Sequence, residues 1–364
     1  MFPSTISVSN LMKFRLRLIP AAILFLAGAT AVLRAEDYVI MTLVGTSNVS
    51  GSADGTPGSF RNPYGIAIDS AKNLYVSDTL NNTIRKITPA RVVSTLAGSA
   101  GTFGSTDGTG SAARFNFPVG LAVDSTGNVY VADSKNFTIR KITAAGVVST
   151  YAGAPFQLGA NDGPVATARF FLPYGVAVDS SGNLYVADGG NHVIRKITAA
   201  GVVSTLAGAA LQSGFGDGPG GAARFNTPWG VAVDGSGNVF VADSGNNAIR
   251  KVTSGGLVTT YAGNSGGGSG AQDGAAAIAR FNQPRGLSVD ASGNVFVADY
   301  ASSVIRLITP GGTVSTLAGS SGIIGEVDSV GTAARFYDTT DVVADGSTIY
   351  VVDSSNNLIR KGVP

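Results

Sequence analysis

A repeat of 55 or 56 residues constrains the fold of this chain more than any other feature. Two of its copies are nearly identical: ARFFLPYGVAVDSSGNLYVADGGNHVIRKIT (168–198) and ARFNTPWGVAVDGSGNVFVADSGNNAIRKVT (223–253). A phenylalanine opens each of the six copies, at Phe60, Phe115, Phe170, Phe225, Phe281 and Phe336. A fixed period of this kind is typical of repeat arrays such as β-propellers. Residues shared by all copies are therefore expected to be architectural, and chemistry is to be sought where the copies differ.

Each copy contains four short segments with the pattern of β-strands. In the second copy these are residues 119–124, 129–133, 137–143 and 147–152, and the third alternates apolar and polar side chains. Glycine-containing turns such as 125–128 and 144–146 separate them. Four antiparallel strands make one propeller blade. The sequence therefore predicts an all-β, six-bladed propeller over residues 36–364.

The two ends of the repeat array suggest how the ring closes. The sixth copy stops after its third strand, at residues 360–364. Residues 38–45 (YVIMTLVG) resemble the outer strands VVSTLAG at 92–98 and 202–208. We predict that this N-terminal segment supplies the fourth strand of the last blade, because closure removes an open sheet edge.

The first 35 residues have the pattern of a secretory signal peptide. Lys13, Arg15 and Arg17 precede a short apolar stretch, and small residues follow it. Cleavage after Ala31 or Ala35 is expected. The alternative is an uncleaved membrane anchor, although the stretch is short beside the roughly 20 residues of a membrane span. We predict a secreted or periplasmic protein with no membrane span in the mature chain.

Composition excludes several function classes. The chain has no cysteine, so disulfides, thiolate metal sites and a cysteine nucleophile are absent. Loss of the signal peptide removes four basic residues and no acidic one, which changes the formal charge from +2 to −2. A nearly neutral protein lacks the basic surface that nucleic acids require, so we expect no nucleic-acid partner.

The repeat pattern resembles a known family. The consensus P-x-G-[VLI]-A-V-D-x-x-G-N-[VL]-Y-V-A-D-x-x-N-x-x-I-R-K-I is similar to the NHL repeat and covers essentially the whole mature chain. The longer insert with Asp-Gly, as at 107–108, 162–163 and 217–218, resembles the long, secreted bacterial form. The resemblance implies a propeller. It is weak for function, because NHL propellers include RNA-binding, protein-binding and receptor sensor domains and a related lyase.

Aspartate dominates the acidic residues, and most of it recurs with the repeat. Of the 23 acidic residues, 18 are aspartates at three recurring positions: the end of the first strand (Asp69, Asp124, Asp179, Asp234, Asp290, Asp345), the end of the second (Asp78, Asp133, Asp188, Asp243, Asp299, Asp353) and the long loop (Asp54, Asp107, Asp162, Asp217, Asp273, Asp328). We expect these to accept hydrogen bonds in turns, and the second set to pair with the recurring arginine of IRK. The alternative is Ca²⁺ in the Asp-Gly loops, although each loop offers one carboxylate and Ca²⁺ takes six to eight oxygens.

Little is left for catalysis once the repeat is subtracted. The remaining carboxylates are Glu36, Asp37, Glu326, Asp338 and Asp341, and the single histidine is His192. One histidine cannot build a multi-histidine metal site, on which the lyase relatives rely. No inner strand carries a glutamate like the one that holds metal near the axis of propeller lactonases. We therefore expect no catalytic residues and no protein metal site, with Ca²⁺ in the loops or at the channel kept as an alternative.

The residue between proline and glycine at the start of each inner strand differs between copies: Tyr64, Val119, Tyr174, Trp229, Arg285 and, in the degenerate sixth copy, Thr340. In a propeller these positions surround one mouth of the central channel. We take Tyr64, Tyr174, Trp229, Arg285 and Asp341 as a candidate ligand-binding site, since aromatic residues and arginine dominate binding surfaces. The alternative is that the aromatic rings only plug the channel. Arg285 and Asp341, in adjacent blades, are expected to pair.

A second variable set lies in the turn between the second and third strands, on the face expected to carry the long loops: Lys135, Phe137, His192 and Tyr300. Together the two sets favour a non-catalytic binding or scaffold protein that recognises a protein, peptide or glycan through this face. The alternative function is a metal-dependent propeller enzyme of the lactonase or lyase type.

Overall fold

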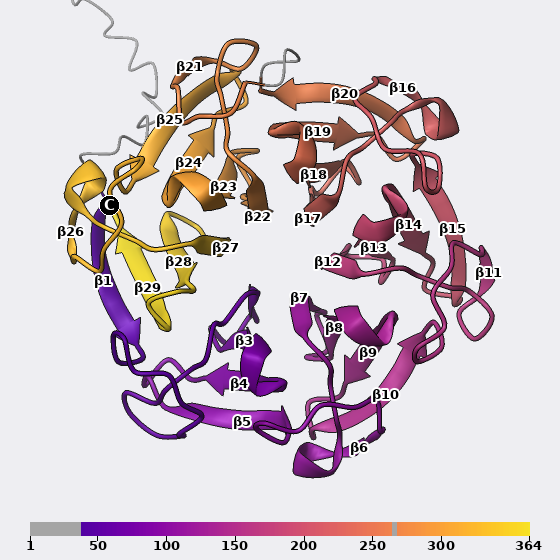
Figure 1. Cartoon of the computed structure of the whole chain (residues 1–364), viewed down its shortest axis with the longest axis horizontal. Coiled ribbons are helices and arrows are strands. Elements are labelled where there is room, and N and C mark those ends of the chain that lie inside the picture. The colour runs from indigo at the N-terminus through magenta and orange to yellow at the C-terminus, as the bar shows by residue number, and fades with distance from the viewer. Residues whose placement is uncertain (1–37, 264–267) are drawn as a thin grey trace, which may run out of the picture. The chain divides into compact units, whose positions relative to one another are not determined.

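Six antiparallel sheets surround a common axis, and each sheet corresponds to one sequence repeat (Figure 1). The computed structural model describes residues 38–263 and 268–364. The predicted signal peptide, residues 1–35, lies outside the described residues. The predicted all-β six-bladed propeller is confirmed.

Four strands of each blade run outward from the axis in chain order. In the first three blades they are β2 (Ile66–Ile68), β3 (Leu74–Asp78), β4 (Thr83–Ile87) and β5 (Val93–Gly98); β7 (Pro118–Val123), β8 (Val129–Asp133), β9 (Thr138–Ile142) and β10 (Val147–Ala152); and β12 (Pro173–Val178), β13 (Leu184–Asp188), β14 (Val193–Ile197) and β15 (Val202–Ala207). In the fourth and fifth they are β17 (Pro228–Val233), β18 (Val239–Asp243), β19 (Ala248–Val252) and β20 (Leu257–Ala262); and β22 (Pro284–Val289), β23 (Val295–Asp299), β24 (Val304–Ile308) and β25 (Thr313–Ala318).

The sixth blade contains both the first and the last described strand. Its order from the axis is β27 (Thr339–Asp345), β28 (Thr348–Asp353), β29 (Leu358–Val363) and β1 (Val39–Val44). The β1 strand pairs antiparallel with β29, from Val39 opposite Val363 to Thr42 opposite Arg360. The first and last described strands are therefore neighbours in one sheet.

Most blades have one strand more than the sequence predicted. A two-residue strand from the long loop pairs with the outer strand in five blades: β6 (Gly108–Thr109), β11 (Gly163–Pro164), β16 (Gly218–Pro219), β21 (Gly274–Ala275) and β26 (Ser329–Val330). The first blade has a single bridge, Gly55 to Val93, at the same place. The glycine of Asp-Gly has a positive φ of 154° at Gly108 and 129° at Gly163, a conformation that favours glycine. The Asp-Gly insert thus lets the long loop run back alongside the outer strand of the blade.

Short 3-10 helices occupy two kinds of connection. Between the second and third strands lie η2 (Thr79–Asn81), η4 (Ser134–Asn136), η5 (Gly189–Asn191), η7 (Ser244–Asn246) and η8 (Tyr300–Ser302), and after the loop strands lie η3 (Gly110–Ala112), η6 (Gly220–Ala222) and η9 (Gly331–Ala333). Among the described residues, no helix has the length and apolar character needed to cross a membrane.

A buried polar network holds each blade together. In the second blade the fully buried guanidinium of Arg140 donates to Asp133 at 2.8 Å and to the loop residue Asp107 at 2.6 Å. It also lies over the ring of Phe115, 5.2 Å from its centroid. The predicted pairing of the second aspartate set with the IRK arginine is confirmed in all six blades. Because buried charges need full pairing, this network explains why these residues recur.

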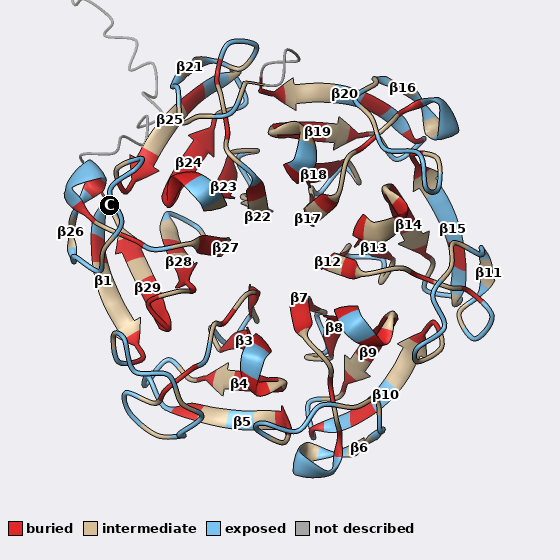
Figure 2. Ribbon diagram, in the orientation of Figure 1, coloured by how far each residue is buried: buried red, intermediate tan, exposed pale blue. Residues whose placement is uncertain are grey.

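The aspartates that end the inner strands close tight turns, as predicted. Asp124 accepts hydrogen bonds from the backbone N–H groups of Thr126 and Asn128, both at 2.9 Å. Partial burial acts to raise the pKa of Asp124, but these hydrogen bonds outweigh it and lower the pKa below its usual value. The buried side chains gather within the blades, and exposed residues gather in the loops (Figure 2).

Candidate functional site

The long loops and the inner-strand starts share one face of the ring. The N–H of Lys135, in the turn after β8, donates to the carbonyl of Asn116, just before β7. In the long loops, the N–H groups of Phe156 and Leu211 donate to carbonyls of η4 and η5. We call this side the loop face, and we call the side where the inner strands end at the first aspartate set the opposite face.

Inner strands approach one another closely at the loop face. A Cβ atom on Gly175 would lie 2.5 Å from the carbonyl oxygen of Trp229, and one on Gly230 would lie 2.3 Å from that of Arg285. Only glycine fits at these contacts. The variable residue before each glycine is thereby placed beside the axis.

Four side chains from three adjacent blades form one continuous stack. The rings of Tyr174 and Trp229 are nearly parallel, with centroids 4.0 Å apart and an interplanar angle of 7°. The guanidinium carbon of Arg285 lies 4.4 Å from the Trp229 centroid and 3.3 Å from that of Tyr300. A ring face has room for one group at such a distance. Tyr174 and Arg285 therefore cover the two faces of the indole.

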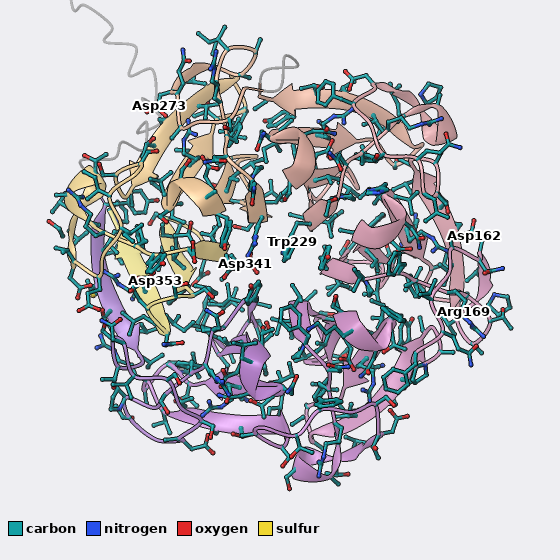
Figure 3. The ribbon with its side chains drawn as sticks, viewed as in Figure 1. Asp162, Arg169, Trp229, Asp273, Asp341 and Asp353 are labelled. Atoms are coloured by element: carbon teal, nitrogen blue, oxygen red, sulfur yellow. The ribbon has the colours of Figure 1, made fainter. Side chains whose placement is uncertain are left out.

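The stack extends across the axis. Tyr64, from the first blade, has its ring centroid 6.3 Å from that of Trp229 in the fourth. Phe117 packs against Tyr64 at 5.6 Å, and the ammonium of Lys135 lies 4.5 Å from the Phe117 centroid. Because contacts reach between opposite blades, these side chains cover the loop-face end of the channel. Trp229 lies near the centre of the ring in Figure 3.

The stack contains some residues from each of the two predicted sets, the channel-mouth set and the turn set. Tyr64, Tyr174, Trp229 and Arg285 are brought together, and Tyr300 joins them from the second set. Phe117 was missed by the sequence reasoning, although it occupies another position that differs between copies. This is the residue just before the recurring proline, which is Thr339 in the sixth copy (Asn62, Phe117, Leu172, Thr227, Gln283, Asp338). The same comparison of copies, applied two positions earlier, would have found it.

The stack has unused hydrogen-bonding capacity. Among the described residues, Nη1 of Arg285 has no hydrogen-bond partner although the atom is buried. Burial raises the pKa of Tyr174, with Arg285 opposing the shift, so the Tyr174 hydroxyl stays protonated at neutral pH. The loop-face mouth thus combines aromatic surface, a cation and hydroxyl groups.

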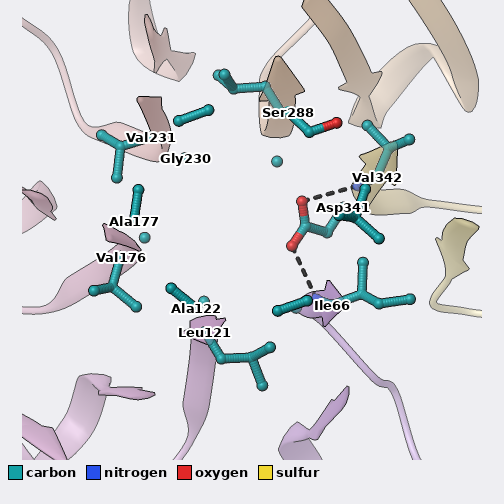
Figure 4. Close-up of a pocket in the computed structure, with 18 of the residues that line it drawn as sticks. Ile66, Leu121, Ala122, Val176, Ala177, Gly230, Val231, Ser288, Asp341 and Val342 are labelled. Carbon is teal, nitrogen blue, oxygen red and sulfur yellow. Dashed lines mark hydrogen bonds between the residues drawn. The ribbon is translucent and has the colours of Figure 1, made fainter. Parts of the chain in front are cut away.

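The predicted pairing of Arg285 with Asp341 is wrong. Oδ2 of Asp341 accepts a hydrogen bond from the N–H of Ile66 at 3.0 Å, and Oδ1 accepts one from the N–H of Val342 at 2.9 Å. Arg285 instead lies between Trp229 and Tyr300, whose rings satisfy the flat guanidinium by stacking. Asp341 replaces the glycine of the other copies, so its carboxylate projects into the channel (Figure 4).

A cavity of about 220 Å³ runs along the axis beneath the stack. Its walls are the inner strands of all six blades, and most of the lining side chains are alanine, valine, isoleucine or leucine. Asp341 is the one charged residue among those that line it, and burial raises the pKa of this carboxyl to about 7. The cavity is therefore an apolar channel with a single acid.

His192 and Phe137 contribute to contacts between blades. Nδ1 of His192 accepts a hydrogen bond from the N–H of Thr227 in the next blade at 3.0 Å. Asn82 and Asn247 use their side-chain oxygens in the same way. Phe137 packs edge-on against Phe171 of the next blade, with ring centroids 5.8 Å apart. Both residues lie in the loop-face turns but outside the stack.

The structure offers no side-chain cluster for a metal in the residues that it describes. Across 38–263 and 268–364, no three histidine, cysteine, aspartate or glutamate side chains are grouped so as to hold an ion. The Asp-Gly loop carboxylates are already engaged, because Asp107 accepts hydrogen bonds from Arg140 and from Thr150. A calcium site in these loops would have to displace those donors.

The described residues define the class of protein, a six-bladed β-propeller. The family model of the NHL repeat matches residues 115–142, 172–197 and 225–252, so the second, third and fourth blades of this propeller contain NHL repeats.

Curated relatives share part of their length with this chain. The chloroplastic protein SUPPRESSOR OF QUENCHING 1 of Arabidopsis thaliana is 30% identical over 286 residues, which cover 73% of this chain and 27% of that protein. Human NHL repeat-containing protein 2 is 30% identical over 279 residues, which cover 67% of this chain and 38% of that protein. The chain thus spans well under half of the length of these relatives.

Among solved structures, an auxiliary nutrient binding protein from Bacteroides thetaiotaomicron superposes with a TM-score of 0.68 at 16% identity, covering 89% of this chain and 76% of the other. At that identity the likeness concerns the fold alone.

Proposed function

We propose that this protein is an exported, non-catalytic binding propeller that recognises a protein or peptide through its loop face. One observation carries the proposal. The residues that differ between copies converge in a single stack at the axis, whereas the recurring polar residues are used up in structural pairs. Tryptophan, tyrosine and arginine at the centre of a surface are the residues that contribute most to protein recognition.

Exposed apolar side chains on the long loops support a protein partner. Phe103, Phe156 and Leu211 come from three successive loops, and their side chains are 70%, 60% and 71% exposed. Ile323 and Ile324, from the loop before the sixth blade, are 52% and 55% exposed. Exposed apolar side chains that recur on one face are typical of interaction surfaces.

The geometry of the stack favours a peptide over a glycan. Sugars bind tryptophan by lying on a free ring face, but Tyr174 and Arg285 already cover both faces of Trp229. The guanidinium of Arg285 suits a carbonyl or carboxylate oxygen, which peptides supply. A glycan ligand remains the second candidate for this face.

Two further points fit the proposal. The signal-like pattern of residues 1–35 agrees with export to the periplasm or the outside of the cell. A solved propeller that carries the name auxiliary nutrient binding protein has a similar fold, which agrees with a binding role. The proposal itself rests on the loop face.

Selection from a displayed peptide library tests the proposal. Peptides recovered with the purified protein are titrated by calorimetry against wild type, Arg285→Gln and Trp229→Ala. Lys72→Gln is the matched control, because Lys72 pairs with Asp345 on the opposite face. We expect a loss of affinity of tenfold or more in the first two variants and none in the control, as for other central interface residues. Peptides that bind all four proteins equally would overturn the proposal, as would ligands found only on a glycan array.

A further inference from the structure

Asp341 is a carboxylate without a cationic partner in an apolar channel. Its two oxygens offer about four acceptor sites, and two of these are used by the backbone N–H groups of Ile66 and Val342. No ion pair joins it to any other described residue, and its surroundings raise its pKa without a neighbouring cation to lower it. Figure 4 shows the Asp341 carboxylate at the edge of the channel, with its two backbone hydrogen bonds dashed.

The wall of the channel selects what can approach this carboxylate. Ala122, Ala177 and Val231 present hydrocarbon to the cavity, so a strongly hydrated ion loses its water shell without replacement. Ser288 and Thr340 also line the cavity, but Oγ of Ser288 accepts a hydrogen bond from the N–H of Ala344, and Oγ1 of Thr340 donates one to the carbonyl of Pro63. A single carboxylate, with two oxygens, falls short of the six to eight oxygens of Ca²⁺. It suits a singly charged group with few hydrogen-bond donors.

The two ends of the cavity differ in their lining. At the loop face, the contact of Tyr64 with Trp229 across the axis closes the channel. At the other end the lining consists of six aliphatic side chains that are all partly exposed: Ile68, Val123, Val178, Val233, Val289 and Val343. Aspartate follows directly on five of these residues, and Asp345 follows Val343 after one intervening residue. These six aspartates place negative charge around this end, while lysines of the third strands offset it farther from the axis.

We propose that the channel binds the ammonium group of a short linear aliphatic amine, which enters from the opposite face and pairs with Asp341. An ammonium carries three N–H donors on a compact head and meets the free acceptor sites of the carboxylate. The alkyl chain lies against the valine and alanine walls. The cavity volume of about 220 Å³ is the volume of about seven water molecules. The cavity therefore has room for a chain of about seven non-hydrogen atoms. Asp341 lies beneath the loop-face stack, at the position that glycine takes in the other copies, but the proposal does not depend on the function proposed for that stack.

The probe is n-hexylamine hydrochloride, titrated by calorimetry into the wild-type protein at pH 8.5 with sodium hexanoate and n-hexanol as comparisons. We expect the amine to bind, hexanoate not to bind, and hexanol to bind at least tenfold more weakly. Between n-butylamine and n-hexylamine we expect the affinity to rise about fourfold per methylene, because each buried methylene contributes a constant increment. Equal binding of amine and alcohol would overturn the proposal, since it would show an apolar tube without an ammonium site.

The variant Asp341→Asn tests the role of the carboxylate. We expect hexylamine affinity to fall about 10- to 100-fold, the usual effect of losing a charged hydrogen-bond partner. Asp338→Asn is the matched control, because Asp338 lies three residues earlier and bonds to Ser355 outside the cavity. Calcium chloride is titrated in parallel. Tight calcium binding that hexylamine fails to displace, or unchanged amine affinity in Asp341→Asn, would overturn the proposal.

Discussion

Trp229 and Tyr174 stack face to face across the boundary between two blades, with ring centroids 4.0 Å apart. The two residues occupy the same variable position in successive repeats, and both are aromatic, so their rings can stack. Arg285 continues it from the next copy. The variable positions of three repeats therefore act as one surface at the axis.

The stack also contributes to stability. We expect Trp229→Ala to lower the free energy of unfolding by about 2–3 kcal/mol, because it removes both aromatic packing and the support for Arg285. Trp229→Phe keeps a ring against Tyr174 and is expected to cost about 1 kcal/mol or less. Urea denaturation followed by circular dichroism measures both values. A cost for Trp229→Ala below about 0.5 kcal/mol would show that the stack is not a packed unit.

The buried arginines hold the blades together. Arg140→Met leaves Asp133 buried without its cation, and we expect a loss of about 3–5 kcal/mol in the free energy of unfolding. Lys141→Met is the matched control on the other face of the same strand, and it should cost less than about 1 kcal/mol. The prediction fails if the two variants have equal denaturation midpoints.

His192 makes stability depend on pH. Its Nδ1 accepts a hydrogen bond, and burial lowers the pKa of His192 below 6.5, so the folded state favours the neutral ring. Below pH 6.5 the unfolded chain binds more protons at this residue, so its contribution to stability falls as the pH falls. His192→Asn matches Asn82 and Asn247 and should lose this dependence. Between pH 7 and pH 5, we expect the free energy of unfolding of the variant to rise relative to that of wild type by up to about 1 kcal/mol. Parallel pH profiles of the two proteins would contradict this role.

Asp341 has the opposite pH dependence. Its folded pKa of about 7 lies above the usual 3.8, so its protonated form favours the folded state. That contribution is present below about pH 4 and is lost as the pH rises through 7. Asparagine accepts from only one of the two backbone N–H groups, so the variant has a constant cost that does not depend on pH. Without added amine, we expect the stability of Asp341→Asn relative to wild type to rise by about 1–3 kcal/mol between pH 5 and pH 8.5. Thermal unfolding at the two pH values measures the difference, and a relative stability that does not rise with pH would be evidence against an unpaired charge.

The β1 strand is expected to be essential for the fold. Deletion of residues 38–45 leaves β29 without its outer partner and exposes the apolar surface around Val44 and Ile359. We expect insoluble protein, or soluble protein that lacks near-ultraviolet circular dichroism. A truncated chain that melts at the wild-type temperature would rule out closure by this strand.

Much of the fold could be predicted because residues that recur in all six copies can be recognised as structural. Phe115 and Arg140 recur in every copy, and their recurrence identified them as structural before their contact was known. The fifth strand could not be predicted, since two residues such as Gly108 and Thr109 carry no strand pattern. The strand forms with glycine at Gly108 and with serine at Ser329, so no single residue type marks it.

The site was harder to predict than the fold. Subtracting the repeat identified Trp229 and Arg285, but it gave no direction for their side chains. Arg285 and Asp341 lie in adjacent copies and have opposite charges, so the sequence predicted an ion pair. In the structure Arg285 stacks on Trp229 instead, and Asp341 accepts hydrogen bonds from backbone N–H groups. Sequence position alone cannot decide between these outcomes, because each depends on groups from other blades.

The emission and acrylamide quenching of Trp229, the single tryptophan, test the central claim that the loop-face stack is a recognition surface. In the free protein we predict moderate quenching, since the indole is partly exposed at the mouth. Addition of a peptide selected for binding to the protein should shift the emission maximum and reduce the quenching. Both changes should saturate with the Kd that calorimetry gives for the same peptide. Saturated binding with no change in either signal would contradict the account, because the partner would then lie elsewhere on the molecule.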